Sequence, residues 1–176
     1  ALTSPAPSAQ LKYWGGPGIS NVNVFTVYWG ASVPDQAKLD AFYGAITQSA
    51  YFDWLAEYDT STQSIGRGSF GGNVAVTSPP SGSTIDDSQI QAEVTHAIAV
   101  NGWTANARHQ FFVFTPKGEG SCFNNSSTCA FTFYCAYHDA FGTTVYANSP
   151  DGTTFSGNCT HPSTFPTDPD PARASS

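Results

Sequence analysis

The segment Asn21–Trp29 (NVNVFTVYW) constrains the fold more than any other, because its apolar residues run almost without interruption. A strand that packs on one face alternates apolar with polar residues, whereas a nearly continuous apolar run is typical of a central strand covered on both faces. We therefore predict a sheet with Asn21–Trp29 at its centre and with helices on its faces.

Two amphipathic patterns predict the helices that cover this sheet. The first spans Asp35–Ser49, and its apolar residues share one face, at Leu39, Phe42, Tyr43 and Ile46. The second spans Asp86–Val100 and ends before Gly102, a residue type that commonly follows the last turn of a helix. A further short turn of helix is predicted at Asp53–Tyr58.

Four more segments predict strands that alternate with the two helices. They are Gly66–Thr77, whose glycines indicate bulges, His109–Phe114, Ala130–Tyr137 and Thr143–Ala147. This alternation is typical of an α/β fold. We predict a single α/β domain at residues 15–165, with a mixed central sheet of about five strands. Residues 1–14 are predicted to form a flexible N-terminal arm, and residues 166–176 an irregular C-terminal tail.

The cysteines lie together in the C-terminal part of the chain, at Cys122, Cys129, Cys135 and Cys159. A structural zinc site favours Cys-x-x-Cys pairs, and this chain has none, so two disulfides are the favoured interpretation. Of the three pairings that four cysteines allow, nearness in sequence favours Cys122–Cys129, which leaves Cys135–Cys159. The C-terminal region is therefore predicted to be stapled by disulfides.

Three asparagines in the same region fit the N-glycosylation pattern: Asn124, Asn125 and Asn158. Disulfides beside glycan acceptors indicate an oxidising secretory route. The chain begins Ala1-Leu2-Thr3, which we interpret as a mature end after processing. No apolar run reaches the length of a membrane span. We therefore predict a secreted, extracellular glycoprotein that does not contact a membrane.

The charge and the motifs exclude some functions. The formal net charge of −7 repels phosphate backbones, and no basic run exists to follow one, so nucleic-acid binding is not expected. The glycine-rich segment Gly66–Gly72 does not match a nucleophile turn and lacks the ending of a phosphate-binding loop. No catalytic signature stands out, and we predict no cofactor.

One group of candidate ligand-binding residues surrounds the second predicted disulfide. A Cys135–Cys159 bond brings His138 and Asp139, at the end of a predicted strand, close to His161. Such a group suits a metal site of unknown identity or an acid–base pair. The alternative is that both histidines are structural and bond to loop carbonyls.

A second candidate is Glu57, which lies near Trp54 and Tyr58. Aromatic rings beside an acid suit sugar binding, because the CH groups of a sugar stack on their faces. The favoured alternative is that Trp54 and Tyr58 are buried and hold a helix against the sheet.

Several short phrases of the sequence occur in an order that resembles one family. They are Gly15-Gly16-Pro17, Ser20–Val24, Val27–Gly30, Ser49–Tyr58, Gly66–Ser69, Tyr134–His138 and Tyr146–Cys159. Together they resemble the exordium or phosphate-induced family of secreted proteins and cover most of Gly15–Cys159. That family spans plant cell-wall proteins and looser bacterial and fungal relatives, so the resemblance implies an extracellular, cell-wall setting.

The bacterial and fungal relatives continue into a helix with a His-Glu pair, similar to a zinc metallopeptidase helix, and no such helix occurs before Ser176. The favoured implication is a non-catalytic module that binds a cell-wall polysaccharide or serves a larger secreted enzyme as an accessory subunit. Its contacts would include exposed aromatics such as Tyr13 and Trp14. The alternative is the N-terminal chain of a metallopeptidase-like hydrolase, completed by a second polypeptide.

Overall fold

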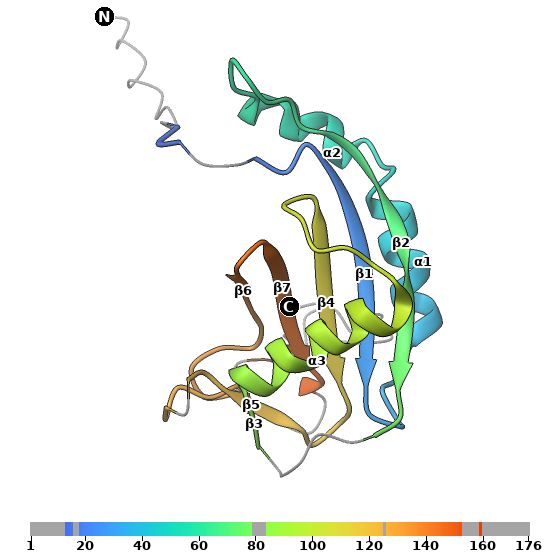
Figure 1. Cartoon of the computed structure of the whole chain (residues 1–176), viewed down its shortest axis with the longest axis vertical. Coiled ribbons are helices and arrows are strands. Elements are labelled where there is room, and N and C mark those ends of the chain that lie inside the picture. Colours follow the sequence, from blue (N-terminus) through green and yellow to red (C-terminus); the bar gives the residue numbers. More distant parts are fainter. Residues whose placement is uncertain (1–12, 16–17, 79–83, 125, 153–158, 160–176) are drawn as a thin grey trace, which may run out of the picture.

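A mixed five-stranded sheet forms the centre of the computed structural model (Figure 1). Its order is β2-β1-β4-β7-β6. The parallel strands are β1 (Asn21–Trp29), β2 (Gly66–Val76), β4 (His109–Thr115) and β7 (Thr144–Pro150), and β6 (Tyr137–Phe141) runs antiparallel to β7. A separate parallel pair consists of β3 (Thr84–Asp86) and β5 (Gly120–Cys122). The structure describes residues 13–15, 18–78, 84–124, 126–152 and 159.

Two main helices, α1 (Gln36–Ile46) and α3 (Asp87–Asn101), cover opposite faces of this sheet (Figure 1). Alternate residues of β1 pack against the two helices. Phe25, Val27 and Trp29 belong to the core cluster that also contains the buried residues of α3, whereas Tyr28 packs with residues of α1. Both faces of β1 are therefore buried, as its continuous apolar run predicts, and the predicted α/β fold is confirmed.

Two short helical segments follow α1, namely α2 (Tyr51–Trp54) and the 3-10 helix η1 (Leu55–Tyr58). The main helices differ from their predicted ranges at the ends. α1 begins after Asp35, whose backbone is left-handed with φ 57°, and α3 begins after Asp86, whose side chain caps the helix by accepting from the Ser88 backbone N–H. None of the helices among the described residues is long and apolar enough to cross a membrane.

The glycines of β2 let this strand approach β1 closely. A side chain at Gly68 would clash with the backbone carbonyl of Val22, and one at Gly71 would clash with the ring of Phe25. The pairing of β1 with β2 also shifts register between Val24 and Phe25, which indicates a bulge.

The two favoured disulfides, Cys122–Cys129 and Cys135–Cys159, are both present. The strand predicted at Ala130–Tyr137 is wrong. Phe131 has a left-handed backbone (φ 68°), and its N–H donates to the carbonyl of Tyr134, so the chain turns between the two disulfides. The strand forms later, as β6.

Two aspartates fasten the main helices to the sheet. Asp40 of α1 accepts hydrogen bonds from Thr26 at 2.9 Å, from Tyr28 at 2.5 Å and from Asn73 at 2.6 Å. On the other face, Asp87 of α3 is 1% exposed. Its carboxylate accepts hydrogen bonds from three side chains: Tyr137 at 2.6 Å, Tyr146 at 2.5 Å and Gln91 at 2.7 Å. A buried carboxylate is tolerated when its oxygens are satisfied in this way.

These contacts predict a loss of stability at alkaline pH. Burial and the hydrogen bond to Asp40 raise the pKa of Tyr28 above its ordinary value, and burial with the hydrogen bond to Asp87 raises the pKa of Tyr146. The unfolded chain releases both phenolic protons near pH 10, whereas the folded chain retains them. We expect the stabilisation to be complete below about pH 10 and the free energy of unfolding to fall above it, by about 1.4 kcal/mol per pH unit for each tyrosine.

Urea denaturation at a series of pH values between about 8 and 11 measures this slope. Tyr28→Phe removes one titrating group, so its slope is expected to be shallower than that of the wild type by about 1.4 kcal/mol per pH unit. Equal slopes for the two proteins would contradict the assignment of this effect to Tyr28.

Candidate binding surfaces

The first candidate is an aromatic surface made of Tyr51, Trp54 and Tyr58, on α2 and η1. These side chains are 51%, 76% and 46% exposed, respectively. Their spacing of three and four residues places them on one side of a helical segment. The prediction that Trp54 and Tyr58 are buried against the sheet is therefore wrong. The three rings are exposed to solvent and are therefore accessible to a ligand.

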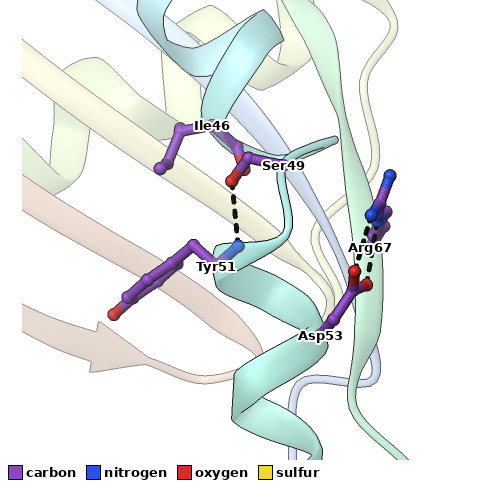
Figure 2. A network of polar contacts seen from close by, with 5 residues as sticks. All are labelled: Ile46, Ser49, Tyr51, Asp53 and Arg67. Carbon is purple, nitrogen blue, oxygen red and sulfur yellow. Dashed lines mark hydrogen bonds and ion pairs between the residues drawn. The ribbon is translucent and has the colours of Figure 1, made fainter.

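Local hydrogen bonds set the start of this helical segment (Figure 2). The Ser49 hydroxyl donates to the carbonyl of Ile46 at 2.7 Å and accepts from the backbone N–H of Tyr51 at 3.3 Å. The Ser49 side chain thus provides a partner for one backbone carbonyl at the end of α1 and for one backbone N–H at the beginning of α2. The ring of Tyr51 points away from the side of α2 that faces β2 (Figure 2).

An ion pair joins the same segment to the sheet. Arg67 of β2 donates two hydrogen bonds to Asp53, at 2.9 and 2.6 Å, in a bidentate arrangement (Figure 2). These bonds lower the pKa of the Asp53 carboxyl below its ordinary value. Because both side chains are exposed, we assign this pair a role in orienting α2 rather than in overall stability.

The acidic residues near the aromatic surface differ in their contacts. Glu57 is exposed, and its carboxylate raises the pKa of the neighbouring Tyr58 phenol. Asp59 accepts the backbone N–H of Ile65 at 2.6 Å and so closes the loop that leads to β2. Glu57 is therefore the carboxylate of this pair that belongs to the aromatic surface.

The second candidate is a cleft of about 870 Å³ between α1 and β6, above β4 and β7. Leu39, Phe42 and Tyr43 of α1 form its wall. Its floor comes from alternate residues of the two strands: Gln110, Phe112 and Phe114 of β4, and Val145, Ala147 and Ser149 of β7. Phe42 shares this face of α1 with Leu39 and Tyr43, as predicted, but its side chain is 54% exposed.

His138 lines this cleft as the second residue of β6, opposite Ala147 of β7. The prediction that His138 ends a strand is wrong, because the residue lies near the beginning of β6. Because β6 runs antiparallel to β7, its first residues nevertheless lie towards the carboxyl ends of the parallel strands, where α/β sheets commonly bind ligands. The described part of the chain provides no hydrogen bond to its imidazole, so the structural alternative lacks a carbonyl partner there.

The structure does not gather the other predicted residues around His138. Asp139 follows it in β6, so its side chain projects from the opposite face of the sheet. Its carboxylate accepts the backbone N–H of Ala140 at 2.7 Å. His161 lies outside the described residues. Within them, no group of three or more His, Cys, Asp or Glu side chains is arranged to hold a metal ion.

Sequence reasoning missed Tyr51 in the aromatic surface and Ser149 in the cleft. The spacing of Tyr51, Trp54 and Tyr58 in the sequence could have identified Tyr51 as part of the aromatic surface. Comparisons with family models, curated proteins and solved structures find no match. The function of both surfaces must therefore be argued from their chemistry.

Proposed function

We propose that this chain is a non-catalytic extracellular module that binds a cell-wall polysaccharide through the aromatic surface. The observation that carries the proposal is the exposure of three rings, on Tyr51, Trp54 and Tyr58, along one side of a short helical segment. Large apolar side chains that are exposed together on a soluble protein commonly mark a recognition site. Sugar rings present CH groups that stack on aromatic faces, while hydroxyl groups at their edges bond to polar neighbours such as Glu57.

Charge favours a neutral polymer over an acidic one. The chain has a formal net charge of −7, and Glu57 adds a carboxylate beside the rings. Arg67 lies on β2 beside α2, and its guanidinium is engaged by Asp53. A polymer of uronic acids would be repelled by this arrangement, whereas a neutral glucan or xylan would not.

The extracellular setting is supported by the two disulfides, since such bonds persist in oxidising compartments. The acceptor Asn124 is exposed, and we propose it as a glycan attachment site. Asn125 and Asn158 lie outside the described residues. The phrases that resemble the exordium family favour the same cell-wall setting.

The proposal is tested by the retention of the protein on insoluble neutral polysaccharides. Trp54→Ala removes the most exposed ring of the surface and is expected to weaken binding about tenfold, which corresponds to about 1.4 kcal/mol of stacking. Its melting temperature should match the wild type, because the Trp54 side chain is 76% exposed. Depletion isotherms with cellulose and xylan measure the affinity.

Phe133→Ala is the matched control, since Phe133 is 65% exposed and lies in the segment between the disulfides. It should bind like the wild type. Failure of the wild type to bind any neutral wall polymer would refute the proposal, and so would equal losses from Trp54→Ala and Phe133→Ala.

A further inference from the structure

The cleft lies over a part of the sheet that α1 does not cover. Parallel strands are normally buried on both faces. On the face of α1, the core cluster joins Tyr28 and Phe114 to Leu39, Tyr43 and Phe112, so it reaches as far as β4. Figure 1 shows α1 beside β2 and β1, at the edge of the sheet remote from β6. On this face, no helix among the described elements fills the space over β7 and β6.

The dimensions of the floor suit a small molecule. From Val145 to Ser149 it extends four residues along β7, or about 13 Å at about 3.3 Å per residue. From β4 to β6 it spans two strand spacings, or about 10 Å. Its volume of about 870 Å³ falls in the range of small-molecule sites. A molecule with two or three rings therefore fits between α1 and β6.

Polar groups lie at both ends of the cleft, with Gln110 near the amino end of β4. Lys38 and Ser149 lie towards the carboxyl ends of the strands, and His138 stands on the neighbouring edge strand. Lys38 is paired with Asp35 at 2.6 Å, which leaves Ser149 and His138 as the available polar groups in this half of the cleft. The middle of the cleft is apolar, with the Tyr43 and Phe112 rings 4.7 Å apart between centroids.

Ser149 provides an independent sign of a ligand. The residue is 7% exposed, and it shares the cleft-facing side of β7 with Val145 and Ala147. The described residues supply no hydrogen-bond partner for its hydroxyl. The Ser149 hydroxyl is not one of the fully enclosed unpaired atoms of the described residues, so it can be reached from the cleft. An unpaired hydroxyl beside an apolar floor is placed to bond a guest.

We propose that this cleft binds a flat, largely apolar small molecule that carries one hydrogen-bond-accepting head group. The rings of the guest pack against Phe42, Tyr43 and Phe112, and its head accepts hydrogen bonds from the Ser149 hydroxyl and the His138 imidazole. This site is separate from the aromatic surface, and its occupation does not depend on polysaccharide binding.

Two fluorescent probes test the proposal with the full chain. Anilinonaphthalene sulfonate has flat rings with an anionic acceptor head, and phenylnaphthylamine has similar rings without that head. Titration of the wild type is expected to show saturable binding of one probe molecule per chain for both. Ala147→Trp fills the floor and should weaken the binding of both probes at least tenfold. Ala75→Trp on β2 is the matched control at an exposed position and should leave both affinities unchanged.

Ser149→Ala tests the head group separately. It should weaken binding of the sulfonate about threefold to tenfold, the effect of one hydrogen bond, and leave phenylnaphthylamine unaffected. Phe42→Ser, at a half-exposed position, should weaken both probes and serves as the second variant if Ala147→Trp melts well below the wild type.

Three results would overturn the proposal. The first is the absence of saturable binding of either probe to the wild type. The second is unchanged affinity in both Phe42→Ser and Ala147→Trp. The third is a wild-type dimer that Phe42→Ser dissociates and that binds no probe, which would make a second copy of the chain the occupant.

Discussion

Val27→Asp is expected to prevent folding at room temperature. Val27 is fully buried at the centre of β1, between β2 and β4 and against the α3 core. The substitution removes an apolar side chain worth about 2 kcal/mol of burial and leaves a carboxylate without a partner, which costs several kcal/mol more. A total of about 5 kcal/mol or more equals the whole stability of many domains of this size. Circular dichroism and urea denaturation of the purified variant measure the loss.

Val100→Asp provides the matched control for this prediction. Val100 is near the end of α3 and is 60% exposed, so the same chemical change there should alter the free energy of unfolding by about 0.5 kcal/mol or less. If Val27→Asp unfolded at the same urea concentration as Val100→Asp, β1 would not be the central strand.

β1 could be located from the sequence because burial on both faces leaves a distinctive mark. Its residues pack alternately on the two helices, so no polar face interrupts the run from Val24 to Trp29. α3 was predictable within one residue for a different reason. Asp86 caps its beginning, and Gly102 ends it with a left-handed backbone (φ 65°), and both are local signals.

The segment Ala130–Tyr137 shows where such local signals fail. Its alternation of aromatic and small residues is the same in a strand and in a loop closed by disulfides. Residues 122 and 129 are bonded to each other, and Cys135 is bonded to Cys159, so covalent geometry decides the path of the chain. One consequence is that Phe133 is 65% exposed, although its residue type suggests burial.

The candidate sites were predictable as residue types but not as surfaces. Trp54 and His138 were both identifiable, yet exposure depends on tertiary placement. Trp54 is exposed because α2 is tied to β2 by Asp53 on another side of the helix. The cleft was not predictable, because it arises where α1 leaves one face of β7 and β6 uncovered. The apolar pattern of a helix indicates which of its faces packs on a sheet, but not which strands it covers.

Asp87→Ala is expected to destabilise the protein by about 3–5 kcal/mol. The substitution removes the acceptor of two tyrosine hydroxyls, on Tyr137 and Tyr146, in a site where Asp87 and Tyr146 are each 1% exposed. Each hydroxyl left without an acceptor costs about 1–3 kcal/mol. The lost carboxylate also stood at the beginning of α3, where negative charge is favourable.

Two comparisons separate this buried cluster from helix capping alone. Asp86→Ala removes the cap of the same helix and should cost about 1 kcal/mol, well below the effect of Asp87→Ala. In the Asp87→Ala background, Tyr146→Phe removes a hydroxyl that lacks an acceptor and should restore stability, whereas in the wild type it removes a hydrogen bond and should lower stability. This reversal of sign is the mark of a coupled pair, and a double-mutant cycle of urea midpoints measures it. Additive effects of the two substitutions would mean that Asp87 stabilises α3 through its charge and not by holding Tyr146 of β7 against the helix.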